Sequence, residues 1–166
     1  MELKSKHLQM YMRIAEAVAE TSSAVRLKVG AVAVKNNMVI GTGYNGLPSG
    51  VDGSCEESVN IPEEKCEAPH EVMLEQGYTY NSHNFHYSGL HTRSEVRHGE
   101  ANLLLNLAKS TESSRGAIIF CTHACCRHCA MDIVDSGVEK FYYRHQYRST
   151  GGIEYLVANN VQVEQI

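Results

Sequence analysis

Residues 121–130, with the sequence CTHACCRHCA, concentrate side chains that bind metals: four of the six cysteines and two of the nine histidines lie in these ten positions. Thiol and imidazole groups at such spacing occur in redox motifs, in structural zinc clips and in metal-dependent active sites. A second short stretch, RHGEA at residues 97–101, adds a histidine and a carboxylate two positions apart. We expect the chemistry of the chain to lie in these two segments.

His98, Cys126 and Cys129 supply one imidazole and two thiols, a donor set that suits a tetrahedral Zn²⁺ ion. Each segment opens a predicted helix, where the helix dipole favours thiolates. Three protein ligands leave the fourth position to water, which distinguishes a catalytic zinc from a closed structural one. Water bound to zinc has a pKa of about 7, so hydroxide becomes available at neutral pH.

Two residues beside these ligands bear on the interpretation. Cys125 is an alternative ligand to Cys126, although the C-x-x-C spacing of Cys126 and Cys129 favours that pair. Taken alone, so dense a cluster is more often a structural clip than a catalytic centre. Glu100 changes this balance, because a carboxylate at a helix start can point toward the water and carry its protons.

Regular elements surround both segments. Apolar residues recur at helical spacing in residues 3–20, and two β-branched runs, 28–35 and 38–45, are joined by an Asn-Asn turn typical of a hairpin. Downstream, the pattern predicts a helix at 99–110, a strand at 117–123, a helix at 126–137 closed by Gly137, a strand at 139–145, a helix at 153–160 and a strand at 161–166. This order predicts a mixed sheet with helices on both faces.

Residues 46–97 differ from the rest, being rich in Gly, Pro, Ser, Asn and His with weak periodicity. We therefore expect one domain, residues 1–166, with a long loop-rich insertion that cannot bury a core of its own. The crowding of Cys and His in the insertion suggests a second, structural zinc site, and the alternative is a plain polar loop. The irregular spacing does not choose a ligand set among Cys55, Cys66, His70, His83, His86 and His91.

Composition limits the class of partner. The chain is 43% hydrophobic and 20% charged, as in an ordinary globular domain, and its formal net charge is −4. That charge lacks the basic excess of a nucleic-acid surface, so a small ligand is favoured over a polynucleotide. Residues 1–20 contain neither a signal-peptide core nor a membrane-spanning run, so we expect no membrane partner and a cytoplasmic location in which thiols stay reduced.

Five stretches, in this order, resemble the cytidine deaminase superfamily, and within it the deoxycytidylate (dCMP) deaminases of bacteria and phages. They are SSAVRLKVGAV, GTGYNGLPSG, HGEANLL, CRHCAMDIVDSGV and FYYRHQYR. The combination of H-x-E and C-x-x-C is the signature of zinc nucleobase deaminases. The resemblance implies an α/β fold, a three-layer αβα sandwich with a mixed five-stranded sheet.

The same resemblance implies hydrolytic deamination of dCMP to dUMP and ammonia, which feeds thymidylate synthesis. Zinc-activated hydroxide would add to C4 of the cytosine, while Glu100 protonates N3 and then carries a proton to the departing ammonia. Asn45 would hold the deoxyribose or the base. Arg26, Tyr147 and Arg148 are candidates for the phosphate, since an arginine offers a dianion two donors at once.

Two positions depart from the family pattern. Cys125 stands where the family has proline, and Gly99 stands where it has alanine, which would let the backbone amide of Gly99 approach the base. His123 and His128 are expected to pack behind the site, and Cys121 is expected to be a buried strand residue.

The resemblance also implies partners beyond the substrate. Family members form homo-oligomers, a hexamer among them, and are activated by dCTP and inhibited by dTTP, with Mg²⁺ accompanying the effector. For a phage-encoded enzyme the location would be the host cytoplasm. Two rival functions are a deaminase acting on a base within tRNA or single-stranded DNA, and a non-catalytic binding module stabilised by zinc.

Overall fold

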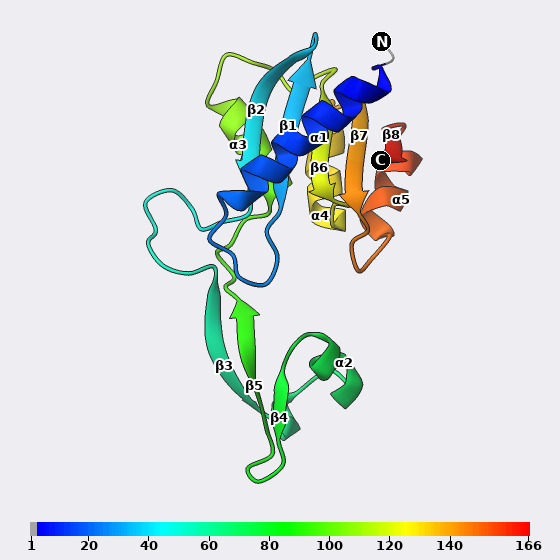
Figure 1. Cartoon of the computed structure of the whole chain (residues 1–166). Coiled ribbons are helices and arrows are strands. Elements are labelled where there is room, and N and C mark those ends of the chain that lie inside the picture. Colours follow the sequence, from blue (N-terminus) through cyan, green and yellow to red (C-terminus); the bar gives the residue numbers. More distant parts are fainter. Residues whose placement is uncertain (1–2) are drawn as a thin grey trace.

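The computed structural model describes residues 3–166, so Met1 and Glu2 of the predicted 1–166 domain lie outside the described range. It contains a five-stranded sheet with flanking helices and a separate three-stranded sheet (Figure 1). The larger body comprises α1 (Ser5–Glu20), β1 (Gly30–Lys35), β2 (Met38–Tyr44), α3 (Gly99–Ala108), β6 (Ile118–His123), α4 (Arg127–Asp135), β7 (Lys140–His145), α5 (Gly151–Ala158) and β8 (Gln162–Gln165).

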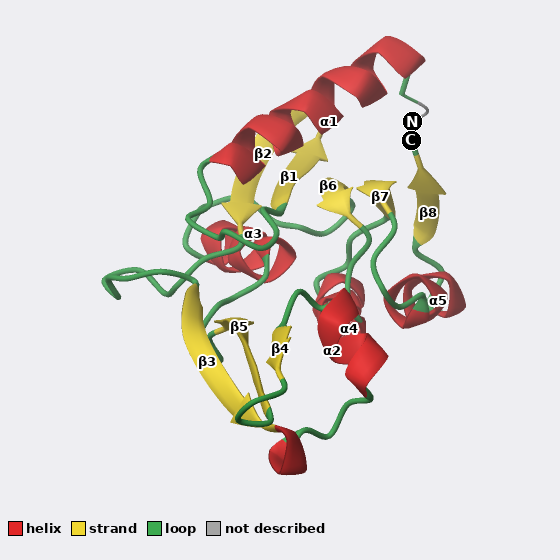
Figure 2. Cartoon of the chain, turned by 60° about the horizontal axis from the view of Figure 1, so that its bottom comes forward, coloured by secondary structure: helices red, strands yellow, loops and turns green. Residues whose placement is uncertain are grey.

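The large sheet has the strand order β2-β1-β6-β7-β8. β1 is antiparallel to both β2 and β6, whereas β6, β7 and β8 run parallel to one another. Helix α1 covers one face, and α3, α4 and α5 cover the other (Figure 2). The predicted αβα sandwich with a mixed five-stranded sheet is confirmed.

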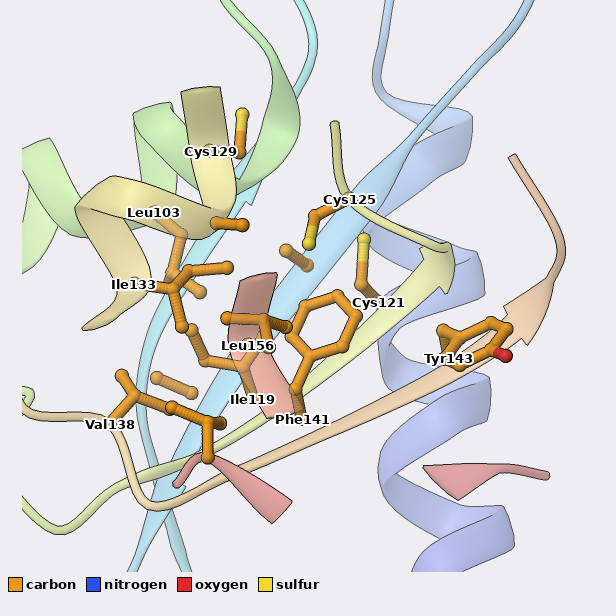
Figure 3. Packing of buried hydrophobic residues seen from close by; sticks show 14 of the residues in the cluster. Leu103, Ile119, Cys121, Cys125, Cys129, Ile133, Val138, Phe141, Tyr143 and Leu156 are labelled. Carbon is orange, nitrogen blue, oxygen red and sulfur yellow. The ribbon is translucent and has the colours of Figure 1, made fainter. Parts of the chain in front are cut away.

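Two cores lie on the two faces of this sheet, because successive strand residues point to opposite sides. Val32, Phe120 and Tyr142 pack with Met12 and Ala15 of α1. Their neighbours along the strands turn to the other face and meet the remaining helices (Figure 3): Ala31, Ala33, Ile119, Cys121, Phe141 and Tyr143 pack with Leu103, Ile133 and Leu156.

The predicted turn residues adopt the backbone that their types allow. Asn36 and Asn37 have φ values of 51° and 61°, as a tight hairpin between β1 and β2 requires. Gly137 has a φ of 73° just after α4, which confirms the predicted left-handed helix end.

The prediction that the insertion buries no core is wrong. It contains β3 (Glu56–Pro62), a short 3-10 helix (Glu63–Lys65), α2 (His70–Glu75), β4 (Thr79–Asn81) and β5 (His86–Thr92), with the antiparallel strand order β3-β5-β4. Met73, Tyr78 and Tyr87 form a small core between this sheet and α2. Periodicity fails to reveal these strands because buried and exposed residues do not alternate regularly along β3 or β5. The loop-rich description therefore does not hold.

Helix α5 approaches the chain beside the predicted metal ligands so closely that only glycine fits. A Cβ on Gly152 would lie 2.0 Å from the carbonyl oxygen of Cys125, whereas a Cβ on neighbouring Gly151 would meet only Ser149 Oγ, at 3.5 Å. Since backbone cannot yield as a flexible side chain can, α5 would have to move away.

We predict that Gly152→Ala lowers the free energy of unfolding by about 2 kcal/mol. Gly151→Ala, the matched control in the same helix, is expected to change it by less than about 0.5 kcal/mol. Urea denaturation followed by circular dichroism measures both. Equal effects of the two substitutions would contradict the close contact.

Candidate active site

The predicted site residues come together because four chain segments meet at one edge of the large sheet. The parallel strands β6 and β7 both end there, at His123 and His145. Since β1 is antiparallel to β6, it begins at this edge, and β2 ends there with Gly30 paired to Tyr44. Ligand sites of α/β sheets commonly lie beyond the carboxyl ends of parallel strands.

His98, Cys126 and Cys129 form a compact cluster at this edge. The Nδ1 atom of His98 lies 3.4 Å from the sulfur of Cys126 and 3.4 Å from that of Cys129. A zinc ion bonded tetrahedrally, at about 2.0 Å to nitrogen and about 2.3 Å to sulfur, holds such atoms about 3.5 Å apart. The three donors therefore fit a zinc ion in both chemistry and spacing.

Two helix starts carry these donors. His98 is the N-cap of α3, and Cys126 is the N-cap of α4, where its sulfur accepts the backbone N–H of Cys129 at 3.5 Å. Residue 98 is also tied to the β2 end of the sheet, because Arg97 and Gly46 exchange backbone hydrogen bonds of 2.9 and 3.0 Å. The ligand geometry is thus fixed by regular backbone.

The two sulfurs differ in acidity. A hydrogen bond from the Cys129 thiol, with another from His98, holds the pKa of Cys126 far below its ordinary value. Cys129 keeps its thiol proton, because the hydrogen bond that it donates to Cys126 raises the pKa of Cys129. Binding of a divalent ion would release this proton, as is usual for thiolate sites.

Glu100 lies two residues after His98, in the first turn of α3. Its side chain is only 3% exposed, and burial raises its pKa to about 7. A carboxyl group with that pKa can both hold and release a proton near neutral pH. The arrangement can therefore support proton transfer next to a metal ion.

A cavity of about 640 Å³ opens over this cluster. The predicted residues that line it are Arg26, Asn45, His98, Glu100, Cys126, Tyr147 and Arg148. Cys129 and Gly99 are not part of its lining. Gly99 is buried at the start of α3, where a Cβ would lie 3.0 Å from the carbonyl oxygen of Val29, and contact of its amide with the base stays a prediction.

Asn45 organises the wall of the cavity. Its side-chain oxygen accepts the N–H of Val29 at 2.8 Å, and its amide nitrogen donates to the carbonyl of Leu27, also at 2.8 Å. Ser22 Oγ donates to the Asn45 carbonyl at 2.6 Å. These bonds join the end of β2 to the loop before β1, and contact of Asn45 with a substrate stays a prediction.

The predicted phosphate residues lie on two different segments of the cavity rim. Arg26 precedes β1, and its guanidinium donates to the carbonyl of Gln76 at 3.1 Å. Tyr147 and Arg148 follow β7, with the Arg148 guanidinium 5.3 Å from the centre of the Tyr147 ring. The cavity joins these segments to the metal cluster, as a substrate with a remote phosphate requires.

The sequence did not predict that residues of the insertion line this cavity. Cys55, Glu56, Gln76, Tyr78 and His91 all line it. Tyr78 donates to or accepts from His91 Nδ1 at 3.0 Å, which fixes both side chains. Weak periodicity gave no sign of this role, although a long insertion in a compact domain is usually functional.

The remaining cysteines and histidines of residues 121–130 take other places. Cys121 and Cys125 are buried in the core between the sheet and the helices, as Figure 3 shows, and burial raises the pKa of the Cys125 thiol. His123 lines the cavity with its ring centre 5.1 Å from that of His145. His128 is exposed, so the expected packing role does not apply to it.

No second metal-binding group appears in residues 3–166: His98, Cys126 and Cys129 are the one set of three or more donor side chains close enough to share an ion. Two of the insertion residues considered for a second, structural zinc site have other partners. His70 Nδ1 lies 2.7 Å from Tyr87 OH, and Cys66 donates to the carbonyl of Ala68 at 3.4 Å.

None of the helices described in residues 3–166 has the length and apolar character needed to cross a bilayer.

Comparison with known proteins places this fold and site in a family. The model of the cytidine and deoxycytidylate deaminase zinc-binding region matches residues 5–145. The deoxycytidylate deaminase of Enterobacteria phage T4 is 30% identical over 148 residues, which cover 82% of this chain and 76% of that protein. The deoxycytidylate deaminase of Mycobacterium phage D29 is 36% identical over 135 residues, 81% of this chain and 91% of that protein.

A solved structure agrees. The dCMP deaminase from the cyanophage S-TIM5, in complex with dCMP and dUMP, has a TM-score of 0.77 and 33% identity, covering 99% of this chain and 100% of that one. The chain belongs to the cytidine and deoxycytidylate deaminase family. The family expected from the sequence is confirmed, and with it a zinc-binding site.

The ligand assignment can be tested by metal content. We predict that His98→Ala, Cys126→Ala and Cys129→Ala each lose zinc, because two remaining donors bind it weakly. Cys125→Ala, the matched control one residue away, should retain about one zinc per chain. Plasma mass spectrometry of the purified proteins measures this. Loss of zinc from Cys125→Ala alone would reassign the ligand.

Proposed function

We propose that the chain is a zinc-dependent enzyme that converts dCMP and water to dUMP and ammonia and so supplies dUMP for thymidylate synthesis. The observation that carries the proposal is the buried carboxylate of Glu100 beside the His98, Cys126 and Cys129 cluster in one cavity. The relatives named deoxycytidylate deaminase, and the phage structure with dCMP and dUMP, support dCMP as the substrate.

The reaction replaces the amino group at C4 of cytosine with oxygen from water. Zinc held by His98, Cys126 and Cys129 would supply a Lewis acid that lowers the pKa of bound water to about 7. Glu100 accepts the proton of the attacking water and gives it to N3 as the C4–O bond forms. Glu100 then takes the remaining proton from the new C4 hydroxyl and delivers it to the amino nitrogen, so that the C4–N bond breaks, the C4=O bond of dUMP forms and ammonia leaves.

The phosphate of dCMP is assigned to the rim of the cavity. Arg26 and Arg148 present guanidinium groups there, from the loop before β1 and the loop after β7, and Tyr147 lies beside Arg148. Guanidinium groups bind phosphate with two parallel hydrogen bonds. Asn45, which lines the same cavity, is the candidate for the deoxyribose or base.

The rival functions have less support. A deaminase of bases in tRNA or single-stranded DNA needs a basic surface, and the formal net charge is −4. A purely structural zinc module gives no reason for a buried glutamate that lines a cavity next to the metal donors.

Assembly and regulation extend the proposal on the family resemblance alone. We propose a homo-oligomer, with a hexamer as one form, activation by dCTP and inhibition by dTTP, and Mg²⁺ bound with the effector. A single zinc per chain is proposed rather than two, in line with the one donor cluster found in residues 3–166. Light scattering, and rates with and without each nucleotide, test these points.

We predict that Glu100→Gln retains zinc but deaminates dCMP about 1,000-fold more slowly, because the amide keeps the shape of the side chain and cannot transfer protons. Ammonia release and metal content are measured on the same preparation. Glu95→Gln, an exposed carboxylate five residues earlier, is the control and should behave as the wild type. An active Glu100→Gln enzyme would refute the proton-transfer role.

A further inference from the structure

The loop between α1 and β1 carries Arg26 but forms neither helix nor strand. It must therefore be held by contacts with other segments if Arg26 is to keep one position at the cavity rim. Ser22 and Asn45 fasten its two ends to the end of β2. The middle of the loop is fastened by a different part of the chain, the insertion.

Glu56 at the start of β3 makes this contact. The backbone N–H of Val25 lies 3.1 Å from each oxygen of its carboxylate, and the N–H of Arg26 lies 3.1 Å from Oε1. The residue is 7% exposed. It takes part in none of the ion pairs found within residues 3–166, so these N–H groups are what compensates its buried charge.

The insertion also holds the other end of Arg26. The guanidinium donates to the carbonyl of Gln76, the residue that caps α2. Glu56 therefore fixes the backbone of Arg26 from β3, and Gln76 restrains its side chain from α2. An additional contact, 3.3 Å between Ser23 Oγ and the sulfur of Cys55, joins the same two segments.

We propose that Glu56 is a positioning residue through which the insertion aims Arg26 at the phosphate of the substrate. The inference rests on the proposed function, and it gives the insertion a role in nucleotide recognition. A buried carboxylate is costly unless it is hydrogen-bonded, and an apolar residue could fill the same space without that cost. The Glu56 carboxylate fixes the backbone N–H groups of Val25 and Arg26, which an apolar residue could not do.

The test is a double-mutant cycle with Glu56→Gln, Arg26→Ala and the double variant. In Gln, the NH₂ group replaces Oε2 opposite the Val25 N–H, and the oxygen that still accepts the two N–H groups is uncharged, so the anchor of the loop is weakened. We expect Glu56→Gln to raise KM for dCMP about tenfold with kcat within about twofold of the wild type. In the Arg26→Ala background the same substitution should change KM by less than about twofold.

Glu57→Gln is the matched control, because Glu57 is the next residue of β3 and is exposed. It should leave KM unchanged. An equal effect of Glu56→Gln with and without Arg26, or no effect at all, overturns the proposal. If Glu56→Gln fails to fold, Glu56→Asp retains the charge at a shorter reach and should show a smaller rise in KM that again depends on Arg26.

Hydrogen exchange tests the anchoring of the loop by Glu56 without depending on deaminase activity. Amides 25 and 26 should exchange faster in Glu56→Gln than in the wild type, with no change in Glu57→Gln, whether or not the protein deaminates dCMP. Unchanged exchange overturns the anchoring role. A wild type that anchors the loop yet releases no ammonia from dCMP overturns the proposed function instead.

Discussion

The structure depends on one constraint: a nitrogen donor must stay about 3.5 Å from each of two sulfur donors, as a zinc ion requires. Unsupported side chains would not keep that geometry, since thiolates repel one another and are well solvated by water. Here His98 and Cys126 are both N-cap residues, and Cys129 lies within the first turn of α4. The two helices are packed on one face of the sheet, so the donor spacing is set by helix packing rather than by loops.

The same sheet edge explains why the substrate cavity is assembled from distant parts of the sequence. Strands that end or begin at this edge bring the loops around Arg26, Asn45 and Arg148 toward the metal donors. The insertion closes the remaining side with Glu56 and Gln76. In this arrangement the sandwich carries the metal donors and Glu100, and the insertion forms part of the wall against which a nucleotide would lie.

Much of the large sheet, its helices and the metal site was predictable from the sequence. The Asn-Asn turn, Gly137 and the alternating apolar residues of the strands fixed the elements locally, and the motif order pointed to the family. The insertion was not predictable, because its small core is built from a few irregularly spaced residues, Met73, Tyr78 and Tyr87. Spacing favoured Cys126 over Cys125 as the ligand but could not show where Cys125 lies, because its burial in the core depends on the packing of the strands and helices around it.

A crystal structure of the zinc-loaded protein, with anomalous diffraction at the zinc edge, tests the central claim most directly. We predict one zinc peak bonded to His98, Cys126 and Cys129, with a solvent molecule as fourth ligand on the side of Glu100. A fourth bond from a side chain, or a peak within the insertion and none at this cluster, would contradict it.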